Sequence, residues 1–210
     1  MIRKKSWFPI AYMFFVTAFF SSIVIGLARV SDERVKANEK LALERAVLSV
    51  LPGVNVKAMT RPQIHDTFTE MISEPDESSN GAYMAKQNGQ IIAYIVPMTG
   101  QGFWAPIKGV IGIKTDKKTI TGIAFYEQNE TPGLGAEITK PAFKDQFQGK
   151  VLSSRGQPLK MRRPGATLSD NEVHAITGAT QTSDRLQIII DNALTKWQGC
   201  GAEKDGGGES

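Results

Sequence analysis

Hydroxyl side chains gather in one short stretch of the sequence, HAITGATQTSD, which runs from His174 to Asp184. Four hydroxyls surround a Gly-Ala pair directly before a run of apolar residues with helical spacing. One interpretation is that Thr182 or Ser183 caps this helix, which contributes about 1 kcal/mol. The other is that a hydroxyl carries an anionic group, since a phosphate at the start of a helix meets free N–H groups and the positive end of the helix dipole. The two interpretations are compatible if Thr180, a little upstream, is the residue that carries the anionic group.

A second stretch, NETPGLGAEI from Asn129 to Ile138, directly follows a predicted strand. Pro132 fixes its own φ angle, whereas Gly133 and Gly135 permit backbone conformations and close approaches that other residues do not. Such a loop suits a flat ligand that lies against the backbone. An ordinary turn between a strand and a helix is the alternative interpretation.

Two predicted hairpins must position these stretches. The run AYMAKQNGQIIAYIV, residues 82–96, has strand-like segments on either side of Asn88-Gly89, a strong hairpin signal. The runs IKGVIGIK and TITGIAFYEQ follow, joined at residues 115–118. Short adjacent strands with tight turns predict an antiparallel sheet, and the flanking helices predict the α+β class.

The last predicted helix covers residues 183–198, and we expect it to pack on the sheet. Its apolar residues share one face; they are Leu186, Ile189, Ile190, Ala193, Leu194 and Trp197. The tail after it, GCGAEKDGGGES, lacks apolar residues and is expected to be mobile. Residues 54–80 have weak periodicity, and SEPDESSNG, residues 73–81, is expected to be an exposed loop.

The N-terminal part predicts a membrane anchor. Residues 7–28, WFPIAYMFFVTAFFSSIVIGLA, carry no charge and exceed the roughly 20 residues that cross a bilayer core. The basic run of residues 3–5 before them favours a cytoplasmic N-terminus. A cleaved signal peptide is the alternative, because Gly26-Leu27-Ala28 has small residues at the spacing of a cleavage site. The anchor is expected to continue as a helix until Pro52-Gly53.

The composition excludes several classes of protein. The chain has 210 residues, 41% of them hydrophobic, and a formal net charge of +4. Its basic residues are scattered among acidic ones, so we expect no binding to nucleic acid. A single cysteine, Cys200, excludes an internal disulfide. With only two distant histidines, His65 and His174, we expect no metal centre built by this chain alone.

The run GFWAPIKGVIGIKTDKKTITGIAFYEQNETPGLGAEI, followed by AITGATQTS, resembles the FMN-binding domain family of the ion-translocating Nqr and Rnf complexes. Within it, the chain is similar to the C subunit of the Na+-translocating NADH:quinone reductase and to the G subunit of the Rnf complex. The resemblance covers the anchor, the ERAVLSVLPG helix, the ETPGLG loop and the TGAT motif, in that order. Which of the two complexes applies stays open.

The resemblance implies FMN attached by a phosphoester bond to the last Thr of the TGAT motif, Thr180, by a separate flavin transferase. It also implies an approach to that site and a loop near the flavin, formed by Thr177, Gly178, Ala179, Glu130, Thr131, Leu134 and Gly135. Phe103 and Trp104 are expected to form an aromatic wall beside the flavin; core positions are the alternative.

The function implied by the resemblance is that of an electron carrier. The chain would be a redox subunit, not catalytic alone, that relays electrons between other subunits of a complex coupling electron flow to Na+ or H+ transport. It would be a single-pass protein of the bacterial inner membrane with its FMN domain on the periplasmic side. The expected division is a cytoplasmic N-terminus (1–6), an anchor (7–28), a helical connector (29–52), the FMN-binding domain (53–198) and a flexible tail (199–210).

Two features depart from the family's pattern. The transferase motif commonly begins with Asp six residues before the modified Thr, where this chain has His174. We interpret His174 as part of the recognition surface or a loop residue, and not as a catalytic base. A second GAT, residues 165–167, follows Pro164 in place of Thr or Ser, and we do not expect it to be an attachment site. The alternative functions are a stand-alone extracytoplasmic flavin reductase and an anchored assembly or sensory module that has lost its flavin.

Overall fold

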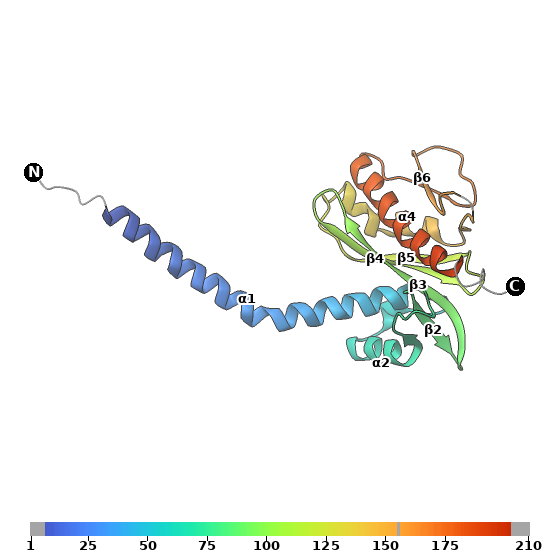
Figure 1. Cartoon of the computed structure of the whole chain (residues 1–210), viewed down its shortest axis with the longest axis horizontal. Coiled ribbons are helices and arrows are strands. Elements are labelled where there is room, and N and C mark those ends of the chain that lie inside the picture. The colour runs from blue at the N-terminus through green and yellow to red at the C-terminus, as the bar shows by residue number, and fades with distance from the viewer. Residues whose placement is uncertain (1–6, 155, 203–210) are drawn as a thin grey trace, which may run out of the picture. The chain divides into compact units, whose positions relative to one another are not determined.

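The computed structural model describes residues 7–154 and 156–202 (Figure 1). The chain divides into two compact units, Met1–Lys40 and Leu41–Ser210. The predicted cytoplasmic N-terminus and residues 203–210 of the predicted flexible tail lie outside the described residues. The other boundaries assigned from the sequence stay predictions.

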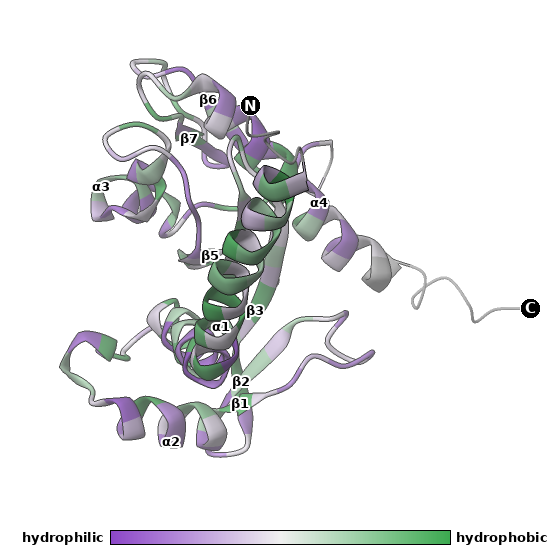
Figure 2. Cartoon of the chain, turned by 90° about the vertical axis from the view of Figure 1, so that its left-hand side faces the viewer, coloured by the Kyte–Doolittle hydropathy of each residue, from purple (hydrophilic) through white to green (hydrophobic). Residues whose placement is uncertain are grey.

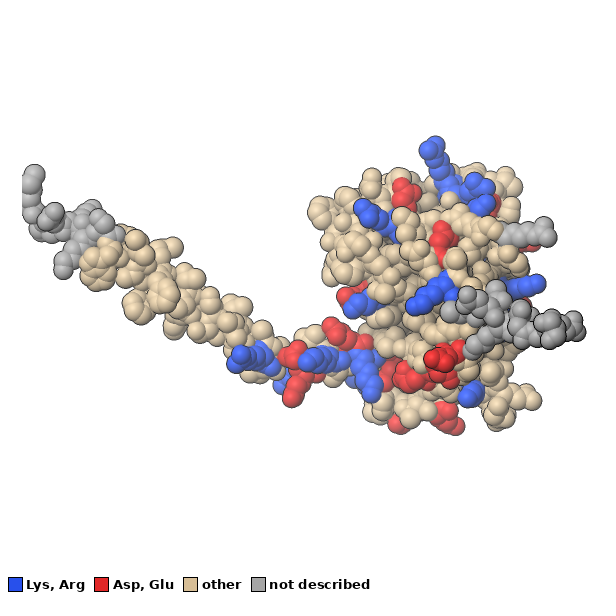
Figure 3. Space-filling view, in the orientation of Figure 1, with Lys and Arg blue, Asp and Glu red and all other residues tan. Residues whose placement is uncertain are grey.

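Helix α1, Trp7–Ser49, contains the whole uncharged stretch predicted as an anchor. By length and composition it can cross a membrane. Figure 2 shows the hydrophobic colouring along this part of the helix, and Figure 3 shows no charged side chain on it. Helix α1 includes residues 29–49 of the predicted connector and ends at Ser49, just before Pro52-Gly53, which confirms the predicted helix and its stop.

The end of α1 belongs to the core of the second unit. Its residues Ala46, Val47 and Leu48 are buried together with Ile64 and Phe68 of α2, Arg61–Met71. Helix α2 was not predicted, because Ile64 and Phe68 alone give a weak periodicity. A signal was present: Thr60 and Gln63 form a capping box, in which the Thr60 N–H donates to the Gln63 Oε1 at 2.8 Å.

The sheet has five strands in sequential order, and every neighbouring pair is antiparallel. They are β1 (Ile72–Ser73), β2 (Tyr83–Gln87), β3 (Gln90–Gln101), β4 (Pro106–Lys114) and β5 (Ile120–Glu127). Both predicted hairpins are confirmed. Asn88 and Gly89 have φ angles of 52° and 77°, which a two-residue type I′ turn requires. The stretch 73–81 connects β1 to β2 as a largely exposed turn, although Ser79 within it is buried.

Helix α4, Thr180–Ala202, lies along one face of the sheet and contacts β3 (Figure 1). The predicted apolar face is confirmed: Leu186, Ile190 and Leu194 are fully buried in a core that also contains Met98 and Ile111. The end of α1 covers the opposite face through the other core cluster. The α+β class is therefore confirmed, with helices packed on both faces of an antiparallel sheet.

Short elements complete the domain after α1 and between β5 and α4. The 3-10 helix η1, Val56–Ala58, follows α1, and the remaining elements are η2 (Gly135–Thr139), α3 (Pro141–Lys144), η3 (Asp145–Phe147), β6 (Lys160–Arg162) and β7 (Glu172–His174). Strands β6 and β7 pair in parallel as a separate small sheet. Strands β6 and β7 were not predicted, because strands of three residues are too short to show an alternating pattern.

The chain segment after α1 is fastened to the sheet at a pair of glycines. The Thr121 hydroxyl on β5 donates to the Val50 carbonyl at 2.6 Å. A Cβ atom on Gly112 of β4 would lie 2.2 Å from the Thr121 Oγ1 and 2.9 Å from the Val50 oxygen. The neighbouring Gly122 has more room, since the nearest atom to its Cβ would be the Val50 Cα at 3.7 Å. Gly112 is therefore needed for this contact, whereas Gly122 is not.

We predict that Gly112→Ala lowers the free energy of unfolding by about 1–3 kcal/mol, because the methyl group displaces Thr121 from its hydrogen bond. Gly122→Ala is the matched control and should change stability by less than about 0.5 kcal/mol. Denaturant unfolding of the full chain in a neutral detergent, followed by tryptophan fluorescence, measures both. Equal stability of the two variants would contradict the account of this contact.

Candidate functional site

A buried carboxylate joins three separate segments at one end of the sheet. Glu130, which follows β5, is only 5% exposed. Its Oε1 accepts hydrogen bonds from the backbone N–H groups of Phe103 at 2.9 Å and Trp104 at 3.1 Å. Its Oε2 accepts one from the Thr182 hydroxyl at 2.7 Å. Because hydrogen bonds to a charged acceptor are roughly twice as strong as neutral ones, Glu130 ties the β3–β4 connection and the first turn of α4 to its own loop.

Two glycines allow the backbone to close around this carboxylate. A Cβ atom on Gly102 would lie 2.6 Å from the Glu130 Oε1. A Cβ atom on Gly135 would lie 2.5 Å from the Thr182 Oγ1 and 2.8 Å from the Glu130 Oε2. The sequence predicted a close approach at Gly135, and the structure shows that the approaching groups are these two side chains. Nothing in the sequence alone identified Gly102.

The ETPGLG loop contains a tight turn that its residue types explain. The Leu134 N–H donates to the Thr131 carbonyl at 3.1 Å, so that Pro132 and Gly133 occupy the two central positions of the turn. Gly133 has a φ of 76°. Proline followed by a residue with positive φ is the pattern of a type II turn. The turn presents Leu134, which is 44% exposed, at the surface.

The TGAT motif forms a second turn, which lies beside the first. The Ala179 N–H donates to the Ile176 carbonyl at 3.2 Å, and Gly178 at its third position has a φ of 77°. A Cβ atom on Gly178 would lie 3.4 Å from a methyl carbon of Leu134. The structure thus brings together two motifs that are about forty residues apart in the sequence, as the hypothesis of a shared site requires.

The start of α4 differs from the prediction. The helix begins at Thr180 and not at Ser183, so neither Thr182 nor Ser183 is its N-cap. Both are buried within the first turn. Thr182 donates to Glu130, and the Ser183 Oγ donates to the Ala179 carbonyl at 2.9 Å while accepting from the Ile176 N–H at 3.2 Å. The capping interpretation was wrong because these hydroxyls hold the helix to the loops before it and to Glu130.

Of the four hydroxyls in the HAITGATQTSD stretch, only those of Thr177 and Thr180 belong to exposed residues. Thr180 is the first residue of a helix of 23 residues. The N–H groups of a first helical turn have no partners within the helix. An anionic group on Thr180 would therefore lie where the helix favours negative charge.

Phe103 and Trp104 are 47% and 65% exposed, so the alternative that they are core residues is wrong. Their rings pack edge to face with centroids 4.9 Å apart. The Trp104 indole N–H donates to the Thr131 hydroxyl at 3.0 Å, and the Trp104 backbone N–H donates to Glu130. An aromatic surface is therefore held in place against the ETPGLG loop while remaining open to solvent.

An ion pair positions the chain that leads to the TGAT motif. On the small parallel sheet, the Arg162 guanidinium donates to the Glu172 carboxylate from Nε at 2.7 Å and from Nη2 at 2.6 Å. Arg162, together with the backbone N–H of Ser169, holds the pKa of Glu172 below its usual range. Because the lower pKa is that of the folded state, this stabilisation is present at neutral pH and is lost as the pH falls through that pKa.

His174 lies at the end of β7, so the loop alternative was wrong, whereas its place on the transferase's recognition surface stays a prediction. Its backbone N–H donates to the Gln146 Oε1 at 2.9 Å. The second GAT lies in the connection between β6 and β7, and the next element after it is a strand. That connection therefore lacks the helix start that follows TGAT. Within the described residues, no group of three or more His, Cys, Asp or Glu side chains could hold a metal ion.

Residues 102–195 match the family model of the FMN-binding domain. The chain is similar to the C subunit of the Na(+)-translocating NADH-quinone reductase of Vibrio anguillarum, with 39% identity over 112 residues, which are 52% of this chain and 44% of that protein. The chain thus matches less than half the length of this curated relative.

Two solved structures share the fold. The crystal structure of the Na(+)-translocating NADH-quinone reductase C subunit from Parabacteroides distasonis has a TM-score of 0.66 and 27% identity, covering 82% of this chain and 96% of that one. Shewanella oneidensis NqrC has a TM-score of 0.63 and 22% identity, covering 80% and 99%, which shows the fold alone. The resemblance predicted from the ETPGLG and TGAT motifs is confirmed.

We predict that Glu130→Ala lowers the free energy of unfolding by about 3 kcal/mol, because it leaves two backbone N–H groups and the Thr182 hydroxyl without their acceptor. Glu130→Gln should cost only about 1 kcal/mol, since its oxygen can still accept both N–H groups and the Thr182 hydroxyl can rotate to accept from its amide. Denaturant unfolding of the full chain measures both changes.

Glu127→Ala serves as the control, because Glu127 forms a more exposed ion pair with Lys108 at 2.6 Å and removing such a pair costs up to about 1 kcal/mol. If Glu130→Ala is no more destabilising than Glu127→Ala, Glu130 does not organise the site.

Proposed function

We propose that this chain is a membrane-anchored electron-carrier subunit that holds FMN covalently through a phosphoester bond to Thr180. The observation that carries the proposal is the exposed Thr180 at the first position of α4, next to the ETPGLG turn. The family match over residues 102–195, which includes both motifs, supports FMN as the ligand. FMN, when attached, supplies the redox chemistry, and the protein supplies binding, orientation and electrostatics.

The residues around Thr180 fit a phosphate and a flat ring system. The phosphate would be held at the N-terminus of α4, where unpaired N–H groups and the helix dipole favour negative charge. Thr177, Gly178 and Ala179 would shape its approach. The exposed apolar and aromatic side chains of Leu134 and Trp104 offer a surface for the ring. Glu130, Thr131 and Gly135 would act indirectly, by holding this surface in place: Glu130 and Thr131 accept hydrogen bonds, and Gly135 leaves room for the Glu130 and Thr182 side chains.

The burial of Glu130 distinguishes residues that would position the site from residues that would contact the flavin. Its carboxylate is buried and fully engaged by Phe103, Trp104 and Thr182, so we assign it to positioning and not to contact with the flavin. Thr131 similarly fixes the Trp104 ring by accepting its indole N–H. These two residues would set the shape of the wall, whereas Leu134 and Trp104 would touch the ligand.

We further propose that the chain works as a redox subunit of a multi-subunit, ion-translocating reductase of the Nqr type and is not catalytic alone. The curated relative from Vibrio anguillarum and the solved structure from Parabacteroides distasonis are C subunits of the Na(+)-translocating NADH-quinone reductase, which favours Nqr over Rnf. The uncharged part of α1 would anchor the chain in the bacterial inner membrane, with residues 53–198 as the flavin domain on the periplasmic side. Its partners would be the other subunits and, during maturation, a flavin transferase.

We predict that Thr180→Ala abolishes covalently bound flavin and leaves the fold intact, because Thr180 is exposed and the hydroxyls that hold α4 belong to Thr182 and Ser183. In-gel flavin fluorescence of denatured protein, made in a host that contains the transferase, measures attachment, and circular dichroism measures the fold. Thr167→Ala, in the second GAT, is the matched control and should keep its flavin. Covalent flavin on the Thr180→Ala protein would rule out the assignment.

A further inference from the structure

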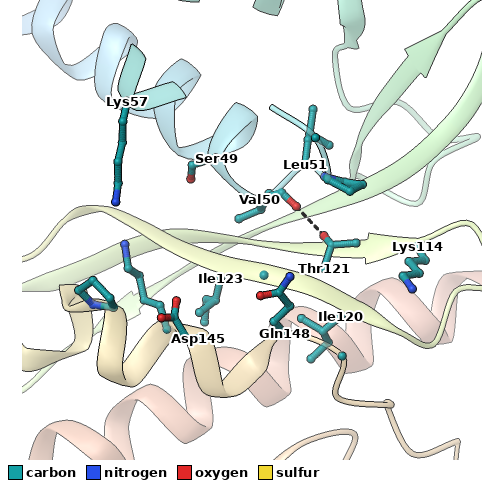
Figure 4. A pocket seen from close by; sticks show the side chains of 16 residues that line it. Ser49, Val50, Leu51, Lys57, Lys114, Ile120, Thr121, Ile123, Asp145 and Gln148 are labelled. Carbon is teal, nitrogen blue, oxygen red and sulfur yellow. Dashed lines mark hydrogen bonds between the residues drawn. The ribbon is translucent and has the colours of Figure 1, made fainter. Parts of the chain in front are cut away.

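A cleft of about 690 Å³ opens on the domain at a place separate from the proposed flavin site (Figure 4). It lies between the segment that follows α1, strand β5 and the α3–η3 region. No residue predicted for flavin binding lines it. Lys57 projects from one wall, and Asp145 and Gln148 project from the opposite one (Figure 4).

Hydrogen bonds between the segments that line this cleft hold its walls in place. The dashed line in Figure 4 is the bond from the Thr121 hydroxyl to the Val50 carbonyl. The Ile120 N–H donates to the Lys150 carbonyl at 2.8 Å, and the Gly149 N–H donates to the Ile120 carbonyl at 2.9 Å. The cleft is therefore preformed, as sites for small molecules usually are.

The charge of the lining is strongly positive. Lys57, Lys114 and Lys144 line the cleft together with a single acidic residue, Asp145, so the ionisable side chains give three positive charges and one negative charge, a net +2. Among the described residues, the ammonium groups of Lys57 and Lys144 have no hydrogen bond or ion pair.

A second hollow, of about 360 Å³, adjoins the first and shares its Ser49, Lys57 and Lys144. The second hollow adds Arg45 and no acidic residue. Lys57 and Lys144 therefore stand where the two hollows meet.

We propose that this cleft binds the phosphate group of a phosphorylated organic molecule. A phosphate monoester carries a charge of about −1.5 to −2 at neutral pH and the phosphodiester of a phospholipid headgroup carries about −1, and the net positive charge of the lining attracts both. Lysine ammonium groups bind phosphate as point charges. Pro52 and Pro141, which also line the cleft and are exposed, provide an apolar surface for the organic part.

The bound phosphate group belongs either to a lipid headgroup or to a soluble phosphate ester, and two measurements separate these sources. Isothermal titration calorimetry uses the full, flavin-loaded chain in a neutral detergent with inorganic phosphate as the probe. With the flavin already attached, the site at Thr180 is filled and does not contribute. We expect saturable binding with a dissociation constant on the order of 1 mM.

A variant pair tests the location. Lys57→Gln combined with Lys144→Gln should weaken phosphate binding by about tenfold or more. Lys86→Gln combined with Lys118→Gln removes two exposed lysines that do not line the cleft, and should leave the affinity unchanged. Absence of saturable binding to the unaltered chain, or equal weakening in the two double variants, would overturn the proposal.

Native mass spectrometry of the chain released from nanodiscs that contain phosphatidylglycerol identifies the source. Phospholipid retained by the unaltered chain and lost from the Lys57→Gln, Lys144→Gln variant indicates a lipid headgroup. Saturable phosphate binding without retained phospholipid indicates a soluble phosphate ester. Phospholipid retained equally by both proteins, together with no saturable phosphate binding, would refute a phosphate site in this cleft.

Discussion

The carboxylate of Glu130 is buried, and a buried charge is tolerated only when hydrogen-bond donors surround it. The chain meets this requirement with donors from two distant segments, the β3–β4 connection and the first turn of α4. Gly102 and Gly135 leave room for the donors to reach it. The rest of the site follows from this constraint, because the loop with Trp104, the ETPGLG turn and the start of α4 cannot move apart without exposing unpaired polar groups.

The division of the hydroxyls at α4 follows from the same constraint. Thr182 and Ser183 are committed to fastening the helix start, which leaves Thr180 exposed at its first position. A covalent attachment there would place its phosphate against the free N–H groups of the helix without disturbing the core. The sheet holds α4 in position, because α4 packs on one of its faces and the end of α1 packs on the other. The phosphate proposed for the basic cleft would bind at a different place, beside β5 and the α3–η3 region.

The parts of the fold with local signals could be predicted from the sequence. Asn88-Gly89 identified a hairpin because few residue pairs adopt its turn, and the apolar spacing in α4 identified the face that packs on β3. Helix α2 was missed since only Ile64 and Phe68 mark its buried side. The sequence left open whether Trp104 is exposed as an aromatic wall or buried in the core, because its hydrogen-bond partners Glu130 and Thr131 lie 26 and 27 residues away along the chain. The start of α4 was misplaced for the same reason: the partner of Thr182 is 52 residues away.

The most direct test of the central claim is peptide mapping by mass spectrometry of the protein purified from its own membranes. The account predicts an added mass of FMN less water on the peptide that contains Thr180, and no added mass on the peptide that contains Thr167. An unmodified Thr180 in this native material would contradict the account. It would show that His174, in place of the motif's Asp, marks a chain that the flavin transferase does not modify, and it would favour an anchored module without a redox role.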